Sequence, residues 1–409
     1  MTFWSDPDGF LANWLIHLLA GIGIPAGIAQ AIGYALGAAV LSTGALLFVL
    51  FLIWLERKMI GRVQDRLGPN RLGPWGIFQS IADMLKIFTK EYITPDGADK
   101  VPYNLSPILT VGAVIMVWAV VPLAITVYGV DLNVGLLYII AVGSLGEMGI
   151  LMAGWGSNNK YALLGAFRAA AQLISYEVPM VLSLLIPVML SGSLNMNKIV
   201  QHQDIWYVLF APLAAFIFFI TSIAEVGRAP FDLTEAESEL VAGFNIEYSG
   251  LKFGMFYVAD FLHSFTISLL VSVVFLGGWR GPGAEASPLL GFVYLILKTS
   301  LVNFIIIIER ASLPRFRIDQ MMDFTWKVLT PVMLILLVAT ALLEKTMAMA
   351  GLVPWMRSGI LFILNIVLLF VADTVVRGHL ARRPRPDVRG KERPVARPEN
   401  YFSQPGSGV

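Results

Sequence analysis

The chain has 409 residues, of which 57% are hydrophobic and only 14% are charged, and its net charge is +1. Soluble domains average about 25% charged residues, so this composition excludes an ordinary soluble fold and indicates an all-α polytopic membrane protein. The sequence contains no cysteine, which excludes a cysteine-ligated iron–sulfur cluster or a thiol nucleophile within the chain.

Nine apolar segments are long enough to cross a bilayer, because a spanning helix needs about 20 mainly apolar residues. Their centres lie near Leu46, Met116, Leu145, Met180, Phe216, Leu270, Leu297, Leu336 and Leu364. We predict an N-terminal extracytoplasmic segment (1–33), an eight-helix core (34–347), an extra C-terminal spanning helix (348–376) and a basic tail (377–409). The segment 1–33 has no Lys or Arg, so we expect it to be retained rather than cleaved as a signal peptide. The Pro/Arg-rich tail is expected to lack fixed structure by itself.

Basic residues alternate from loop to loop. The loops after the first, third, fifth and seventh spans, and the tail, are rich in Lys and Arg. The opposite side holds only Lys198, Arg280, Lys345 and Arg357. Because basic loops stay in the cytoplasm, this pattern predicts an N-terminus outside and a C-terminus in the cytoplasm.

The loop after the first span predicts an amphipathic interfacial helix from about Trp75, following the turn residues of 68–74. One face would hold Ile77, Ile81, Met84, Leu85 and Phe88, and the other Gln79, Asp83, Lys86 and Lys90. Such a helix either lies on the lipid surface or forms one wall of a cavity open to the membrane interior.

Five ionisable residues fall inside the predicted spans: Glu147, Glu177, Asp260, His263 and Lys298. At about 1.5 Å per residue, each lies roughly 12–16 Å from its cytoplasmic helix end, near the middle of a ~30 Å hydrocarbon core. Ionisable groups at this depth are typical of ion or proton pathways. The alternative is an ion pair of Lys298 accompanied by protonated, hydrogen-bonded carboxyls.

The segment 225–248, EVGRAPFDLTEAESELVAGFNIEY, joins the fifth and sixth spans. It holds one base, Arg228, and the acids Glu225, Asp232, Glu235, Glu237, Glu239 and Glu247. Asp232 and Glu235 have the spacing of a capping box, which would account for two of these acids. The others indicate a cluster of carboxyls that titrate as a set.

Four phrases resemble the quinone-site membrane subunits of proton-pumping NADH:quinone oxidoreductase, respiratory complex I. They are E-R-K-x-x-x-x-x-Q-x-R-x-G-P-N-R, G-W-x-S-N-x-K-Y-A-L-L-G, R-x-P-F-D-L-x-E-x-E-S-E-L and R-x-x-x-P-R-x-R-x-D-Q, within about Leu55 to Pro331. Ser80 departs from the pattern, where a proline is usual. The resemblance implies a subunit of an enzyme complex in the bacterial inner membrane. It would form a quinone-access tunnel and the first leg of a proton path.

The resemblance also implies roles for individual residues. The quinone cavity would involve Arg57, Lys58, Arg62, Gln64, Arg66, Asp83, Lys86, Glu91, Arg228, Phe231 and Asp232. The proton path would involve Glu147, Glu177, Glu225, Asp232, Glu235, Glu237, Glu239, Glu247, Asp260, His263 and Lys298. A peripheral subunit would contact Arg310, Arg315, Arg317 and Asp319, which as plain sequence are also ordinary cytoplasmic charge.

The implied substrate is ubiquinone or menaquinone, with FMN and iron–sulfur clusters only in partner subunits. The implied partners are peripheral quinone-site subunits, small membrane subunits and lipid, but no nucleic acid. Two alternatives remain open: the homologous membrane anchor of an energy-converting hydrogenase, and a stand-alone ion-coupled transporter. A transporter would carry an inverted internal repeat, and none is visible. The subunits that co-purify would discriminate among the three.

The nine-span interpretation predicts opposite sides for the two ends of the chain. Because there is no native cysteine, a single cysteine at Ser5 should react with a membrane-impermeant thiol reagent only from outside. One at Ser403 should react only from the cytoplasm. Labelling of intact cells and inverted vesicles measures this, and labelling of both positions from one side would rule out nine spans.

Overall fold

The computed structural model describes residue 16 and residues 25–233, 241–351 and 353–382, and all regular structure within them is helical. The longer helices are α2 (Ala26–Val63), α4 (Lys100–Trp118), α5 (Gly135–Gly156), α6 (Lys160–Ser191), α9 (Pro212–Val226), α11 (Gly250–Phe275), α12 (Pro288–Ser312), α14 (Thr330–Met349) and α15 (Pro354–Arg382). The shorter ones are η1 (Pro74–Gly76), α3 (Gln79–Thr89), α7 (Met196–Gln201), α8 (Tyr207–Phe210), η2 (Gly243–Asn245), α13 (Ile318–Phe324) and η3 (Thr325–Leu329).

The all-α polytopic prediction is confirmed. Within the described residues, 8 helices are long and apolar enough to cross a membrane, and α9 is a shorter apolar helix of 15 residues. Each of the nine predicted segments therefore coincides with a helix. The first of these, α2, begins at Ala26, before the predicted boundary at residue 33. The sidedness of the two ends stays a prediction.

The second span differs from its predicted position. Its apolar run is centred near Met116, yet α4 begins at Lys100 and ends at Trp118. The chain then turns back, with the amide of Val130 donating to the carbonyl of Ala119. Pro122 explains the early end, because proline and the residue before it are disfavoured in a continuing helix.

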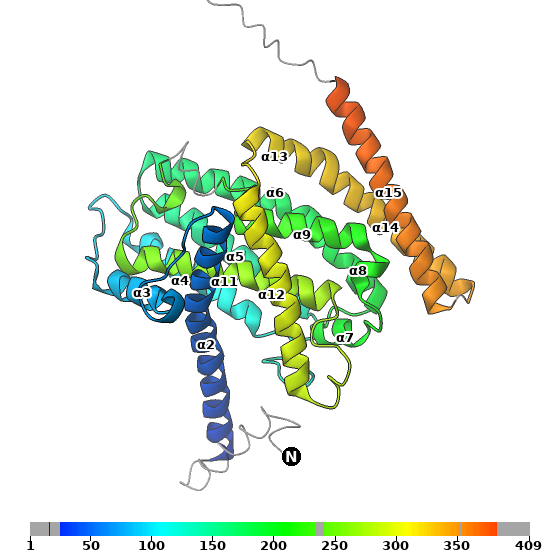
Figure 1. Cartoon of the computed structure of the whole chain (residues 1–409), viewed down its shortest axis with the longest axis horizontal. Helices are drawn as coiled ribbons and strands as arrows, with labels where there is room; N and C mark the ends of the chain where they lie inside the picture. The colour runs from blue at the N-terminus through cyan, green and yellow to red at the C-terminus, as the bar shows by residue number, and fades with distance from the viewer. Residues whose placement is uncertain (1–15, 17–24, 234–240, 352, 383–409) are drawn as a thin grey trace, which may run out of the picture.

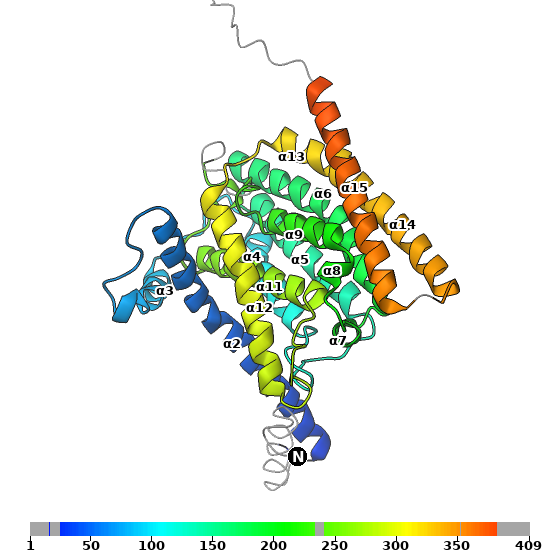
Figure 2. The same ribbon diagram turned by 45° about the vertical axis from the view of Figure 1, so that its right-hand side comes forward.

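The long helices cross at steep angles around a central one. In Figure 1, α6, α9 and α14 run side by side across the view, whereas α2 and α12 are steeply inclined to them. Helix α11 lies at the centre. In its 18-residue apolar stretch 83% of the residues are buried, compared with 11% in the corresponding stretch of α15. Figure 2 shows α15 passing in front of α14, which it contacts. The centre of the bundle is therefore where buried polar groups have to find partners.

The predicted amphipathic helix forms as α3, beside the end of α2 and the start of α11 (Figure 1). Its apolar residues Ile81, Leu85 and Phe88 are exposed, while Ser80 is buried against the protein. The departure at Ser80 thus lies on the packed side of the helix.

The segment after the fifth span is placed by a close backbone contact. A Cβ atom on Gly165 of α6 would lie 2.6 Å from the carbonyl carbon of Gly243 in η2. Only glycine at position 165 lets η2 approach α6 this closely. The contact directs Phe244 and Asn245 towards the centre of the bundle.

Candidate functional site

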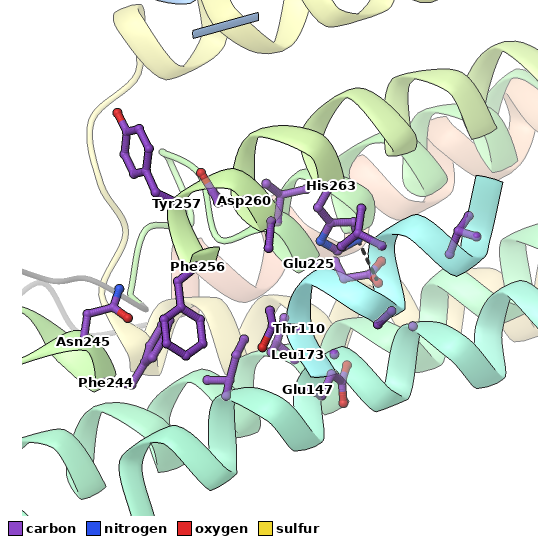
Figure 3. A pocket seen from close by; sticks show the side chains of 18 of the residues that line it. Thr110, Glu147, Leu173, Glu225, Phe244, Asn245, Phe256, Tyr257, Asp260 and His263 are labelled. Carbon is purple, nitrogen blue, oxygen red and sulfur yellow. Dashed lines mark ion pairs between the residues drawn. The ribbon is translucent and has the colours of Figure 1, made fainter. Parts of the chain in front are cut away.

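A cavity of about 110 Å³ lies between α4, α5, α9 and α11, with η2 and one residue of α6 completing its wall. This volume accommodates several water molecules. Three carboxyls and one imidazole line it: Glu147, Glu225, Asp260 and His263 (Figure 3). Three different helices bring these groups to one space, although they are widely separated in sequence.

Glu225 and His263 form the closest ionisable pair in the cavity. Glu225 lies in the last turn of α9, and its Oε1 is 3.8 Å from Nε2 of His263 on α11 (Figure 3). On the α5 side, a Cβ on Gly143 would lie 3.9 Å from the same oxygen. The absence of a side chain there leaves room beside the carboxyl.

Glu177 does not line the cavity but adjoins the helix face that does. Ser144 donates a 3.2 Å hydrogen bond from its Oγ to Oε1 of Glu177. Ser144 and Glu147 are three residues apart on α5, so they share one side of that helix. Helix α5 thus lies between the Glu177 carboxyl of α6 and the cavity, and Ser144 of α5 contacts that carboxyl.

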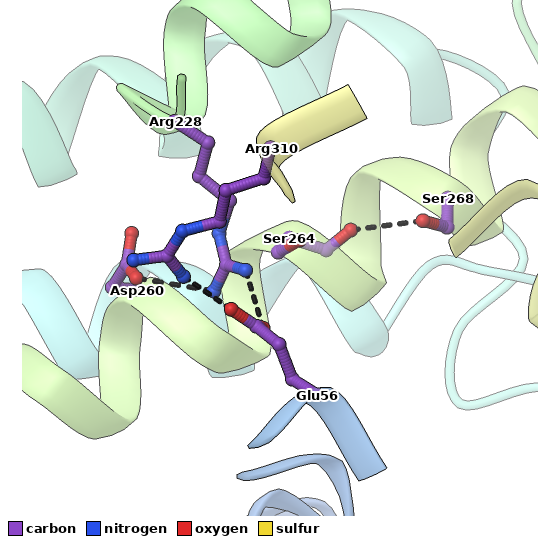
Figure 4. Close-up of polar contacts among 6 residues, drawn as sticks. All are labelled: Glu56, Arg228, Asp260, Ser264, Ser268 and Arg310. Atoms are coloured by element: carbon purple, nitrogen blue, oxygen red, sulfur yellow. Dashed lines mark hydrogen bonds and ion pairs between the residues drawn. The ribbon is translucent and has the colours of Figure 1, made fainter. Parts of the chain in front are cut away.

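A buried ion network begins at the cavity wall (Figure 4). Arg228, which is 3% exposed, binds Oε2 of Glu56 at 2.5 Å through Nη1 and Oδ2 of Asp260 at 3.2 Å through Nη2. Arg310 pairs with the other oxygen of Glu56. The Arg228 guanidinium also lies over the Phe261 ring, 4.8 Å from its centroid. Asp260 therefore belongs to both the cavity and the network.

The electrostatics of Arg228 follow from these neighbours. Burial by itself would lower the pKa of its guanidinium, but the carboxylates of Asp260 and Glu56 more than offset this. The resulting pKa lies above the ordinary value, so Arg228 is a fixed positive charge.

Glu56 is the residue of this network that sequence reasoning missed. It follows Ala45, Val49 and Leu52 at helical spacing, and all four side chains are buried. An acid on such an apolar stripe needs a buried partner, and that was the available signal. The prediction chose its neighbours instead, the exposed Arg57 and the half-buried Lys58.

The predicted cavity residues of the first loop gather around the end of α2 and α3, outside the described cavity. Nη1 of Arg57 lies 2.5 Å from Oδ2 of Asp83, and Lys86 lies 3.8 Å from the other oxygen of Asp83. Nζ of Lys58 donates to the carbonyl of Pro69 at 2.9 Å. Arg66 donates to Oε1 of Gln64 at 2.7 Å. Arg62 and Glu91 are exposed.

The acidic segment divides into three parts. Phe231 is buried against Tyr176, and Oδ2 of Asp232 forms an ion pair with Nη2 of Arg315 at 2.7 Å. Glu247 accepts a 2.7 Å hydrogen bond from the amide of Asn159. Three predicted acids lie outside the described residues: Glu235, Glu237 and Glu239.

Lys298 lies apart from the other predicted mid-depth groups. Its Nζ donates to the carbonyls of Leu276, Gly278 and Arg280 at 2.8, 2.9 and 2.8 Å. Those carbonyls belong to the end of α11 and the loop after it, where helix carbonyls lack partners and a cation is favoured. Lys298 is therefore held outside the cavity, and the shared depth of the five ionisable groups stays a prediction.

The expected contacts to a peripheral subunit divide in two. Arg310 and Arg315 are occupied by the internal pairs described above. Arg317 and Asp319, at the start of α13, are exposed. Arg315 is exposed as well, so three of the four residues present charge outward.

Apolar helices of membrane-spanning length around a cavity of ionisable groups, backed by a buried ion network, define a polytopic membrane protein with a polar centre. A family model described as NADH dehydrogenase matches residues 36–341. The H subunit of the NADH-quinone oxidoreductase from Dehalococcoides mccartyi (strain CBDB1) is 49% identical over 322 residues, 79% of this chain and 88% of that protein. Proteins of the same name from Geobacillus sp. (strain WCH70) and Magnetococcus marinus are 46% and 47% identical over 314 and 297 residues. These alignments cover 76% and 72% of this chain, and 94% and 87% of the respective relatives.

The chain belongs to this NADH dehydrogenase family, as its four sequence phrases predicted. The family match ends at residue 341. Helix α15 lies beyond it.

The ion network predicts a large difference between two acid-to-amide substitutions. Glu56→Gln leaves Arg228 and Arg310 with an uncompensated charge, and breaking a buried pair costs about 3–5 kcal/mol. Asp83→Asn breaks the surface pair with Arg57, which is worth about 0–1 kcal/mol. Thermal unfolding of the solubilised protein should show a much lower midpoint for Glu56→Gln only. Equal midpoints for the two variants would contradict a stabilising network.

Proposed function

We propose that the chain is a membrane subunit of proton-pumping NADH:quinone oxidoreductase that forms the quinone-access tunnel and the first leg of the proton pathway. It lies in the bacterial inner membrane, with its N-terminus outside and its C-terminus in the cytoplasm. The observation that carries the proposal is the joining of the acid–histidine cavity to the Arg228 network through Asp260. Membership of a family whose relatives carry the oxidoreductase name supports the particular reaction.

The proton path begins with the carboxyls around the cavity. A relay needs titratable groups that one or two waters can bridge. Glu147, Glu225, Asp260 and His263 meet this requirement by lining one water-sized space, and Glu177 adjoins it through Ser144. Asp232, Glu247 and the acids of 234–240 extend the path towards the quinone. Lys298, bound by three carbonyls, supports the fold of this pathway rather than carrying protons.

The quinone tunnel enters between α2 and α3. The exposed side chains of Ile81, Leu85 and Phe88 offer an apolar surface for an isoprenoid tail. Arg57, Lys58, Arg62, Gln64, Arg66 and Lys86, together with Asp83 and Glu91, supply polar groups for the head-group end. A quinone head group carries carbonyl oxygens, which accept hydrogen bonds from cationic side chains. Arg228, Phe231 and Asp232 form the inner boundary towards the ion network.

Electron transfer is assigned to partner subunits. NADH oxidation would use FMN and iron–sulfur clusters in those chains, and ubiquinone or menaquinone would be reduced at the junction with a peripheral subunit. Arg310, Arg315, Arg317 and Asp319 are the charges that this chain would present for that contact, and the last three are exposed. Small membrane subunits and lipid would cover the exposed apolar helix faces.

A second candidate is the membrane anchor of an energy-converting hydrogenase. The names of the relatives favour the oxidoreductase. Affinity purification of the tagged full chain from its native membrane tests this directly. We expect flavin and iron–sulfur subunits with NADH:quinone activity, whereas nickel–iron hydrogenase subunits would overturn the assignment.

The tunnel proposal predicts that two exposed cations matter for quinone but not for NADH. Lys86→Ala and Arg62→Ala should each lower kcat/KM for quinone about tenfold, the equivalent of one lost charged hydrogen bond. NADH oxidation by a soluble artificial acceptor should be unchanged, because the flavin is elsewhere. Lys90→Ala, also exposed and placed at the C-cap of α3, is the matched control. Equal effects at positions 86 and 90 would rule out a specific entrance.

The relay proposal predicts a contrast at Glu225. Glu225→Gln keeps size and hydrogen bonding but removes titration, whereas Glu225→Asp keeps titration and shortens the reach. In assembled complex, Gln should reduce quinone turnover and proton pumping together by about 100-fold or more, and Asp by much less. Glu285→Gln, an exposed acid in the α11–α12 loop, is the control. Wild-type turnover and pumping in Glu225→Gln would remove this residue from the path.

A further inference from the structure

Helix α9, which carries Glu225, is a short helix with a break before it. Its 15 residues extend about 22 Å, less than the ~30 Å of a hydrocarbon core. It follows the single turn of α8 after Ala211, whose backbone is non-helical at φ −134° and ψ 64°. The break frees carbonyls at the end of α8 and amides at the start of α9.

One side chain from α15 serves both sides of this break. Asn365 is 1% exposed and lies at the middle of the apolar stretch Trp355–Thr374, which is long enough to cross a membrane. Its Oδ1 accepts from the amide of Leu213 at 3.2 Å, and its Nδ2 donates to the carbonyls of Phe210 at 3.4 Å and Leu361 at 2.8 Å. Backbone groups left unpaired in an apolar layer cost several kcal/mol each, so this bridging has energetic weight.

The opposite end of α9 is held in the same way. Gln172 of α6 is fully buried, and its Nε2 donates to the carbonyls of Ala224 at 2.6 Å and Phe231 at 2.8 Å. Two buried amide side chains thus hold α9, one at each end. One belongs to the family core and the other to α15, beyond the matched residues 36–341.

We infer that Asn365 is a positioning residue for the proton path, and that α15 is part of the pathway scaffold rather than only a membrane anchor. Leu213 and Glu225 lie about 18 Å apart along one rigid helix. A shift or rotation at the α8–α9 break therefore moves the Glu225 carboxyl relative to His263 and Glu147. The inference rests on the proposed role of Glu225.

The test uses Asn365→Leu in the full oxidoreductase complex, normalised to assembled enzyme by NADH oxidation with an artificial acceptor. Leucine keeps the approximate size and removes the bridging groups. We expect quinone reduction to fall about tenfold, as for a reacting group displaced by a fraction of an ångström. The pH midpoint of turnover should shift, which a loss of assembled enzyme alone would not cause. Ile363→Ala, on the exposed side of α15, should leave both unchanged.

A second variant keeps the test decisive where Asn365→Leu fails to assemble. Asn365→Gln retains the amide one methylene further out and should shift the pH midpoint in the same direction by less. A wild-type rate and pH midpoint per assembled complex, in whichever variant assembles, would overturn the inference.

Glu225→Gln, measured in parallel, separates the two levels of the proposal. If Glu225→Gln loses pumping while the Asn365 variant is unaffected, only the positioning role of α15 is overturned, and the role of Glu225 stands. Wild-type pumping in Glu225→Gln would overturn the role of Glu225, and the positioning argument with it.

Discussion

The ion pairing of the buried Arg228 guanidinium is the interaction on which the remaining architecture depends. A charge that is 3% exposed within an apolar bundle is tolerable only when paired and hydrogen-bonded. Its partners come from separate elements: Glu56 from α2 and Asp260 from α11. Arg310 of α12 pairs with the second carboxylate oxygen of Glu56. Moving any of these helices would leave a buried charge without its partner. The network therefore fixes the relative placement of α2, α11, α12 and the segment after α9.

The cavity exists because side chains are missing on one of its walls. Gly143 and Gly146 lie on the cavity side of α5, and the glycine at 143 leaves space next to Glu225. Carboxyls enter from α5, α9 and α11, so no single helix contains the site. Rigid placement by the ion network and open space beside the acids are complementary. The first sets the distances between the acids, and the second leaves a space large enough for several water molecules.

Sequence reasoning predicted the features that depend on local pattern. Long apolar runs and amphipathic spacing sufficed for the nine helical segments and for α3, and the charged positions identified most acids of the site. It failed where the answer depended on a distant neighbour. Glu56 lies on an apolar stripe and was overlooked, and the sequence around Lys298 could not identify the carbonyls at the end of α11 that bind it. Asn365 carried no local signal, because its partners lie about 150 residues away in the chain.

The orientation of α3 has a consequence for the lipid around the protein. Its outward side chains, Ile81, Leu85 and Phe88, match hydrocarbon, while Asp83 and Lys86 match the aqueous boundary, so the helix settles where the two meet. Asp83 is also tied to Arg57 at the end of α2, a helix whose own depth follows its apolar length. Bilayer thickness acts separately on the depth of α2 and on the depth of α3. A thinner or thicker membrane thus strains the Arg57–Asp83 ion pair and alters the spacing of α2 and α3, which makes acyl-chain length a determinant of how these two helices sit together.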